Sequence, residues 1–242
     1  MSMVEFSAVA KNFGATQVLH DINLKIEAGE VVVIIGPSGS GKSTLLRCIN
    51  KLEEISSGTL LVAGMHITDP HANECDIRRE AGMVFQQFHL FPHLTALENV
   101  MFGPLRVRKQ SKATAREQAL ALLDRVGLRE RANHYPAELS GGQQQRLCLA
   151  RTLALEPEIL LLDEPTASLD PATTHTIENL LLKLAERYPI LLVSHGLPQA
   201  KRMASRIVLF GKGRLQGMLS PEELPNEAEM NRFFDGGDAG NR

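Results

Sequence analysis

Short stretches that are apolar at every position recur along the chain, and three of them lie just before candidate functional residues. They read VVVII at 31–35, ILLL at 159–162 and ILLV at 190–193, and a glycine or a polar residue follows each at once. Unbroken runs of this length, rich in Val, Ile and Leu, are typical of strands buried on both faces of a parallel sheet. Stretches with helical patterns lie between the runs. This alternation predicts an α/β fold with a mainly parallel sheet.

The beginning of the chain has a different pattern. From Val4 to Lys25 apolar and polar positions alternate more regularly, with turn-forming residues at 11–14 (KNFG). Alternation with a period of two is typical of strands that place one face on the core. We therefore expect antiparallel strands that flank the main sheet.

The middle of the chain, roughly residues 88–157, is expected to be mostly helical. Residues 114–117 (TARE) have the spacing of a capping box, and Gly127 is suited to end the helix that follows. We expect a single domain over residues 1–242. Its core lobe would cover about 1–87 and 158–220, its inserted helical subdomain about 88–157 and its tail about 221–242. The last residues, 236–242, are expected to be disordered.

Composition narrows the class of protein. A hydrophobic fraction of 43% supports a sizeable core, and a formal net charge of −2 lacks the basic excess of nucleic-acid-binding proteins. Cys48, Cys75 and Cys148 form no CxxC pair, which favours free thiols over a disulfide framework or a zinc site. The N-terminus does not resemble a signal peptide, and no apolar run approaches the roughly 20 residues of a membrane span. We expect that a partner would have to hold the chain at a membrane.

A glycine-rich segment follows the first apolar run. Residues 36–43 (GPSGSGKS) fit GxxxxGK[ST] between a predicted strand and a predicted helix, which is the setting of a phosphate-binding P-loop. Glycines let backbone N–H groups turn toward phosphate oxygens, and the helix start adds partial positive charge. In such a loop Lys42 reaches the β- and γ-phosphates, and Ser43 is a Mg²⁺ ligand. The expected nucleotide contacts are Gly36, Pro37, Ser38, Gly39, Ser40, Gly41, Lys42, Ser43 and Thr44.

Two acidic residues follow the second apolar run. Asp163 and Glu164 are neighbours at a predicted strand end, so their side chains point in different directions. One can then organise Mg²⁺ while the other polarises a water molecule. The alternative is a pair of exposed loop acids. These features indicate a P-loop NTPase without distinguishing a kinase, a GTPase or a motor.

A second candidate phosphate cradle lies about a hundred residues later. Residues 138–150 read ELSGGQQQRLCLA, in which Ser140 and Gln143 have the spacing of a capping box. Taken alone, the segment is equally compatible with a well-formed helix start.

The order and spacing of these segments resemble the ATP-binding cassette of ABC transporters, from Val4 to about Leu219. Matching positions are Leu139–Gln144 for the signature motif, Gln86 for the Q-loop, Leu160–Asp163 for Walker B, Ser168–Asp170 for the D-loop, His195 for the switch histidine and Phe13 for the adenine-stacking aromatic. The resemblance implies a RecA-like P-loop NTPase core with an antiparallel β subdomain and an inserted α-helical subdomain. It also implies ATP and Mg²⁺ as cofactors.

The resemblance assigns further roles. It implies catalytic functions for Glu164, His195, Lys42 and Gln86 and metal contacts from Ser43, Gln86 and Asp163. Nucleotide contacts outside the P-loop would come from Phe13, Ser140, Gly141, Gly142, Gln143 and Asp170. Plainer alternatives remain: core packing for Phe13, a surface amide for Gln86, a strand-end histidine for His195 and a helix cap for Asp170.

The resemblance also implies partners. Two chains would pair head to tail, so that each ATP lies between Lys42 of one chain and Ser140 of the other. Membrane permease subunits would bind the pair at the cytoplasmic face of the cell membrane, and a solute-binding protein would act through them. No nucleic-acid partner is expected. The basic residues Arg106, Arg108, Lys109 and Lys112 are interpreted as a solvated loop, with lipid headgroup contact as the alternative.

Within this family, residues 83–95 (MVFQQFHLFPHLT) and 47–53 (RCINKLE) are similar to importers of polar amino acids of the glutamine type. Phe88, Leu90, Phe91 and Leu94 would line a groove for a helix of the membrane subunit, or pack in the core. Residues 146–151 and 194–200 instead resemble phosphate-importer ATPases, with Gly196 where an acid is usual. We expect the ATPase subunit of a bacterial importer for a polar amino acid such as glutamine. A phosphate or oxyanion importer, or a soluble ABC ATPase outside transport, are the alternatives.

Overall fold

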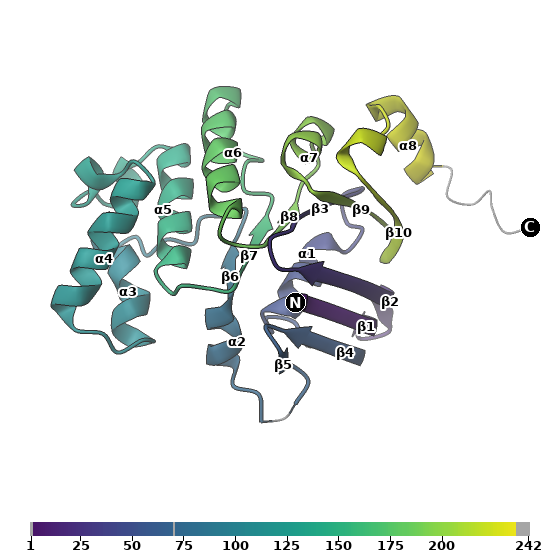
Figure 1. The fold of residues 1–242 in the computed structure, drawn as a ribbon, viewed down its shortest axis with the longest axis horizontal. Coiled ribbons are helices and arrows are strands. Elements are labelled where there is room, and N and C mark those ends of the chain that lie inside the picture. Colours follow the sequence, from purple (N-terminus) through teal and green to yellow (C-terminus); the bar gives the residue numbers. More distant parts are fainter. Residues whose placement is uncertain (1, 70, 236–242) are drawn as a thin grey trace, which may run out of the picture.

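Two sheets organise the chain (Figure 1). The computed structural model describes residues 2–69 and 71–235, so the disorder expected for 236–242 lies outside the described residues. The larger sheet has the order β10-β9-β3-β8-β7-β6. Its strands are β10 (Arg214–Leu219), β9 (Arg206–Gly211), β3 (Val31–Ile35), β8 (Ile190–Val193), β7 (Ile159–Asp163) and β6 (Ala81–Val84).

The larger sheet is parallel except at one edge. The five strands from β9 to β6 pair in parallel, and only β10 joins antiparallel, beside β9. The three apolar runs form β3, β7 and β8, and every residue of these strands is buried. The predicted α/β fold is confirmed. Because parallel strands end at the same edge, the residues after β3, β6, β7 and β8 are brought together there.

The smaller sheet is antiparallel, as the alternating N-terminal pattern predicts. It has the order β2-β1-β4-β5, formed by β2 (Thr16–Glu27), β1 (Ser2–Phe13), β4 (Ser57–Val62) and β5 (Met65–His66). Helix α1 (Lys42–Ile49) packs between the two sheets, since Leu45 and Ile49 share one buried cluster with Phe6 of β1 and Leu161 of β7.

A tight turn connects the two sheets. Gly213, between β9 and β10, donates its N–H to Ser40 O at 3.0 Å and accepts from His20 N of β2 at 2.8 Å. Its φ is +72°, and a Cβ at this position would lie 2.2 Å from Val18 O. Only glycine fits such a close backbone approach. The P-loop backbone is thereby bonded to the antiparallel sheet.

The other face of the parallel sheet is covered by helices. These are α5 (Gly141–Leu153), α6 (Pro171–Ala185), α7 (Leu197–Met203) and α8 (Glu227–Asp235). The helix α8 and the turn η3 (Pro221–Glu223) occupy the beginning of the segment expected to be a tail, and Met230 of α8 is buried. No helix among the described residues has both the length and the apolar character needed to cross a bilayer.

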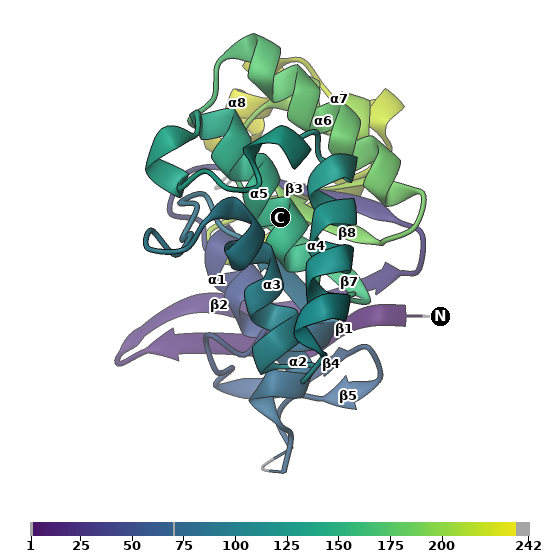
Figure 2. The ribbon, with the colours of Figure 1, turned by 90° about the vertical axis from the view of Figure 1, so that its left-hand side faces the viewer.

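A block of helices lies at one end of the molecule. It contains α3 (Ala96–Arg106), α4 (Lys112–Arg125), η1 (Arg129–Arg131) and η2 (Pro136–Glu138), and it packs on α5 through a separate buried cluster. Figure 2 shows this block from its outer side, with α3 and α4 in view. The remaining helix, α2 (Glu74–Glu80), leads into β6.

The predicted start of α4 is wrong by about one turn. Ser111 is its N-cap and accepts a hydrogen bond from Thr114 N at 3.2 Å, so Thr114 lies inside the helix. Both positions carry hydroxyls that can cap a helix, and the first along the chain takes the role. Gly127, at φ +69°, follows the helix end as expected.

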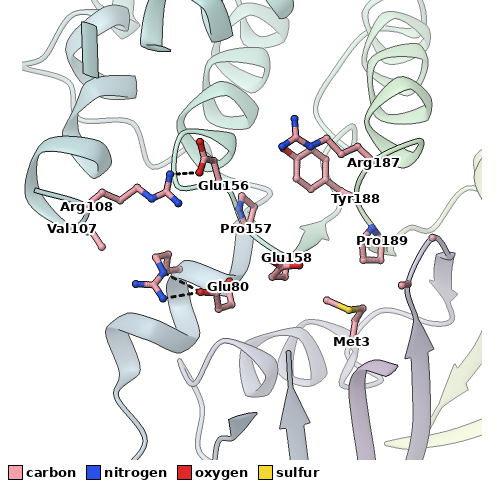
Figure 3. A pocket seen from close by; sticks show the side chains of 13 residues that line it. Met3, Glu80, Val107, Arg108, Glu156, Pro157, Glu158, Arg187, Tyr188 and Pro189 are labelled. Atoms are coloured by element: carbon pink, nitrogen blue, oxygen red, sulfur yellow. Dashed lines mark hydrogen bonds and ion pairs between the residues drawn. The ribbon is translucent and has the colours of Figure 1, made fainter. Parts of the chain in front are cut away.

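A hollow of about 740 Å³ opens at the end of the parallel sheet where β6, β7 and β8 begin, opposite to the end that carries the P-loop (Figure 3). Charged side chains line it, and four of them form two ion pairs. Arg79 is 2.8 Å from Glu80, and Arg108 bonds to Glu156. None of the predicted site residues is among the described residues that line this hollow.

Candidate functional site

The P-loop between β3 and α1 is shaped by its glycines. A Cβ on Gly36 would lie 1.8 Å from Phe210 O, so the loop backbone rests directly on β9. Gly39 and Gly41 have φ values of +73° and +106°, in the region that favours glycine. Gly41 caps α1 without a side-chain hydrogen bond. The first N–H groups of this helix are therefore available to an anion.

Lys42 is buried in the hollow of the loop. Its Nζ donates to Gly36 O at 2.8 Å and to Pro37 O at 2.7 Å, and its side chain is 4% exposed. Burial lowers the pKa of Lys42, and the nearby carboxylates Glu164 and Asp163 partly oppose that shift. Phosphate oxygens could take the place of the two carbonyl acceptors.

A polar atom of the same loop has no partner. Ser40 Oγ is buried, and no hydrogen bond from the described part of the chain satisfies it. A buried hydroxyl without a partner is costly, and it often marks a place where a ligand or water binds. The observation fits a phosphate oxygen at this position.

Ser43 and Asp163 form the second part of the site. Ser43 Oγ donates to Asp163 Oδ1 at 2.8 Å, which joins the start of α1 to the end of β7. Burial raises the pKa of Asp163, although the Ser43 hydrogen bond opposes the shift. Two oxygen ligands held together beside a phosphate cradle suit Mg²⁺, which prefers oxygen donors.

Glu164 and His195 form the third part. His195 Nε2 lies 2.5 Å from Glu164 Oε1, and Glu164 N donates to Val193 O at 3.1 Å. Glu164 has φ +49°, in the left-handed region that side-chain-bearing residues rarely adopt. The neighbouring acids contact different groups, Ser43 and His195. His195 is thus paired with Glu164, an arrangement compatible both with a catalytic role and with a satisfied strand-end histidine.

Gln86 and Phe13 lie at the margins of the site. Gln86 is exposed two residues beyond β6, at the same sheet edge as Asp163. Phe13 ends β1, is 45% exposed, and has Lys11 Nζ 4.5 Å from its ring centroid. Its ring is outside the buried core, which leaves a face free for stacking.

The second cradle begins helix α5. Ser140 Oγ accepts from Gln143 N at 3.4 Å, and Gln143 Oε1 accepts from Ser140 N at 2.9 Å, so the predicted capping box is present. Asp170 caps α6 by accepting from Thr173 N at 3.0 Å, and bonds from Thr173 lower its pKa. A Cβ on Gly141 would lie 3.4 Å from Leu169 Cδ2, which places the two helix starts side by side.

The structure does not bring the two cradles together within one chain. Among the described residues no hydrogen bond or ion pair joins 140–143 to 36–43. In Figure 1, β6 and β7 lie between α5 and α1. The helix start at Ser140 and the P-loop are thus separate in the described part of one chain.

We expect Gly142→Ala to destabilise the contact between α5 and α6. A Cβ there would lie 2.1 Å from Thr173 Cγ2, and overpacking of this kind costs about 1–3 kcal/mol. The thermal midpoint of the variant should fall, and ATP hydrolysis should fall with it. Thr173→Ser removes the clashing methyl group, so the double variant should recover, and Thr173→Ser alone is the control. An unchanged midpoint in Gly142→Ala would show that the contact is absent.

Arg151 was not predicted as part of the site. It donates to His89 O at 2.6 Å and to Phe88 O at 3.3 Å, while Cys148 Sγ donates to Phe88 O at 2.9 Å. Burial raises the pKa of Cys148 to about 12. Helix α5 thus holds the segment that follows Gln86. No sequence signal marked these contacts, because arginine in a helix usually reads as exposed.

The aromatic segment after Gln86 divides between core and surface. Phe88 and Leu90 pack against buried clusters, as the core-packing alternative predicts for these two. Phe91 is partly exposed, and its ring lies 4.6 Å from that of Phe102, which is 39% exposed. Phe91 and Leu94 are therefore the partly exposed residues of the segment outside these clusters, and Phe91 lies beside Phe102 of α3.

Comparisons with known proteins show the family of the chain. The family model described as ABC transporter matches residues 19–167. The glutamine transport ATP-binding protein GlnQ of Escherichia coli is 59% identical over 223 residues, covering 92% of this chain and 93% of that protein. The arginine transport ATP-binding protein ArtM of Bacillus subtilis is 45% identical, with coverage of 92% and 93%.

Solved structures show the same fold. The dimeric, post-hydrolysis ATP-binding cassette MJ0796, bound to ADP and Pi, has a TM-score of 0.80 at 37% identity, covering 92% of this chain and 100% of that one. The cbiO1 protein of Clostridium perfringens, part of the transporter complex cbiONQ, has a TM-score of 0.86 at 29% identity, with coverage of 96% and 93%. The chain therefore belongs to the ABC transporter family, as an ATP-binding and ATP-hydrolysing subunit.

Proposed function

We propose that the chain energises uptake of a polar amino acid of the glutamine class, at the cytoplasmic face of the membrane and bound to permease subunits. A solute-binding protein would supply the amino acid to the permease. Support for the solute comes from relatives named for glutamine and arginine transport. Support for the chemistry comes from the convergence of Lys42, the Ser43–Asp163 pair and the Glu164–His195 pair at one sheet edge.

ATP binding would use the atoms that the P-loop leaves available. Lys42 would exchange its carbonyl partners for β- and γ-phosphate oxygens, and Ser40 Oγ would gain an acceptor. The uncapped start of α1 would add its N–H groups and its partial positive charge. Phe13 would stack its exposed ring on the adenine.

Ser43, Asp163 and Gln86 would hold Mg²⁺. When bound, the ion would neutralise charge on the β- and γ-phosphates. The buried carboxylate of Asp163 gains from a neighbouring cation, because burial alone disfavours its charged form. These residues place oxygen ligands next to the P-loop.

Glu164 would polarise the attacking water. In the present arrangement His195 occupies one carboxylate oxygen of Glu164, so the pair must separate for a water to bind between them. His195 would then contact the γ-phosphate, and Lys42 would stabilise the charge that develops on it. The hydrolysis step thus depends on how closely the loops of Glu164 and His195 are held.

We also propose that the second cradle completes the site of another copy. Ser140 is exposed at a well-capped helix start, close to the start of α6, and no hydrogen bond or ion pair among the described residues joins it to its own P-loop. Two chains in head-to-tail contact would place each ATP between Lys42 of one and Ser140 of the other. The helical block at 88–157 would move with the signature helix as a subdomain.

Mixing two inactive variants tests this arrangement. Lys42→Ala removes a P-loop cation, and Ser140→Arg blocks the signature helix start. Each variant alone should have no complete site, whereas a mixed dimer should have one, so the mixture should regain part of the ATPase activity. As a control, adding the Lys42→Ala/Ser140→Arg double variant to wild type should lower activity, because those mixed dimers have no complete site. Full wild-type activity in the first mixture, or none, would contradict the composite site.

A further inference from the structure

A buried glutamine joins three elements beneath the catalytic edge. Gln199 lies in α7 and is 7% exposed. Its Oε1 accepts from Ser194 Oγ at 2.6 Å, and its Nε2 donates to Thr166 Oγ1 at 3.0 Å and to Glu178 Oε1 at 3.1 Å. One amide group therefore connects the end of β8, the loop after β7 and helix α6.

The direction of these bonds is fixed by Glu178. This side chain is almost fully buried, and Arg202 donates to both of its oxygens at 2.8 Å. A carboxylate only accepts hydrogen bonds, so the amide nitrogen of Gln199 must face it and the amide oxygen must face Ser194. The Ser194 hydroxyl must then donate to Gln199, and its lone pairs accept from Gly196 N at 3.0 Å.

These bonds hold the turn that carries His195. Ser194 N donates to Ile34 O at 3.1 Å, which anchors the turn on the parallel sheet, and the Ser194 hydroxyl closes it through Gly196. Thr166 lies two residues after Glu164. The same amide group thus restrains the loops that carry both members of the Glu164–His195 pair.

Packing does not supply this restraint on the open side of the pair. A hollow of about 260 Å³ lies there, and Glu164, Thr166, His195 and Gln199 are among the residues that line it. Where close packing is missing, the relative position of two loops depends on the bonds between them. The amide of Gln199 supplies such bonds to both loops.

We propose that Gln199 is a positioning residue for ATP hydrolysis, which sets the separation of His195 and Glu164 through Ser194 and Thr166. The inference rests on the proposed roles of His195 and Glu164. None of the hydrogen bonds of Gln199 involves the P-loop, so the residue should affect the hydrolysis step and leave ATP binding unchanged.

Gln199→Leu in the full-length chain tests the proposal. The variant keeps a similar volume and loses all three bonds. Its kcat should fall about ten- to a hundredfold, the size expected when catalytic groups are misplaced by up to about 1 Å. KM for ATP and the Kd of a fluorescent ATP analogue should stay within about twofold, because the P-loop contacts are intact. Thr176→Val, which changes an exposed hydroxyl on α6, is the matched control and should keep wild-type kcat.

A second variant separates positioning from folding. Glu178→Met/Gln199→Met replaces both buried polar groups, and half-exposed Arg202 can turn to solvent. Removing Glu178 together with Gln199 removes the carboxylate that lost a donor, while Ser194 and Thr166 still lack their Gln199 partner, so the thermal midpoint should lie above that of Gln199→Leu while kcat stays low. Recovery of kcat in this variant would overturn the proposal, as would a raised KM with unchanged kcat in Gln199→Leu.

Glu164→Gln, measured in parallel, distinguishes the role of the Glu164–His195 pair from the positioning role of Gln199. If Glu164→Gln keeps wild-type kcat, the proposed role of the pair fails. If Glu164→Gln is slow while Gln199→Leu is as fast as wild type, the pair stands and the positioning role of Gln199 is overturned.

Discussion

Glu164→Gln should slow ATP hydrolysis by about a hundred- to ten-thousandfold, which is the usual contribution of a general base. The amide cannot accept a proton from water, although it keeps the size of the carboxylate. ATP binding should be unchanged, because Lys42 and the P-loop are untouched. Steady-state hydrolysis and the Kd of a fluorescent ATP analogue measure the two effects. Glu158→Gln is the control. It changes an exposed acid just before β7, the strand that Glu164 follows, and should keep wild-type activity.

The same variant should accumulate as a dimer. If ATP holds two chains together until it is hydrolysed, a chain that binds ATP without hydrolysing it stays in the closed pair. Size-exclusion chromatography with and without MgATP should show a dimer only with nucleotide. A variant that binds ATP, does not hydrolyse it and remains monomeric at saturating MgATP would contradict the shared site.

Lys42→Ala should act on ATP binding and not on the hydrolysis step alone, and should abolish binding at ordinary ATP concentrations. Truncating one partner of a buried, charged hydrogen bond costs about 2–5 kcal/mol, and each 1.4 kcal/mol is about tenfold in affinity. We therefore expect Kd for ATP to rise at least about thirtyfold. Titration with the fluorescent analogue measures it, and Lys183→Ala, an exposed lysine on α6, is the control. A variant with normal affinity and slow hydrolysis would assign Lys42 to the transition state alone.

The central strands could be predicted from the sequence, because their burial on both faces requires an unbroken run of apolar residues. A strand buried on both faces must be apolar throughout, so β3, β7 and β8 could be predicted from their own residues. β6 reads Ala-Gly-Met-Val and has no such pattern. It is a strand because it pairs with β7, and a pairing of that range cannot be read from four residues.

The candidate site likewise contains residues that the sequence could predict and contacts that it could not. Lys42, Ser43, Asp163 and Glu164 could be predicted because each lies in a short motif next to a recognisable strand. Contacts that depend on how helices cross the sheet could not be predicted. Gln199 meets Glu178 only because α6 and α7 pack side by side, and each residue alone reads as an exposed helical position. The predicted start of α4 was wrong for a local reason, since Ser111 and Thr114 can both cap a helix.

The turn at Gly213 makes the two sheets mechanically dependent on each other. One peptide unit holds Ser40 of the P-loop, and the carbonyl of the same residue holds His20 of the antiparallel sheet. A tilt of that sheet must therefore either carry the P-loop with it or break a backbone bond. The turn therefore fixes the distance between the antiparallel sheet, which carries Phe13, and the P-loop, which carries Lys42. The contacts proposed for one nucleotide, Phe13 with the base and Lys42 with the phosphates, would thus be held at a fixed separation by two backbone hydrogen bonds.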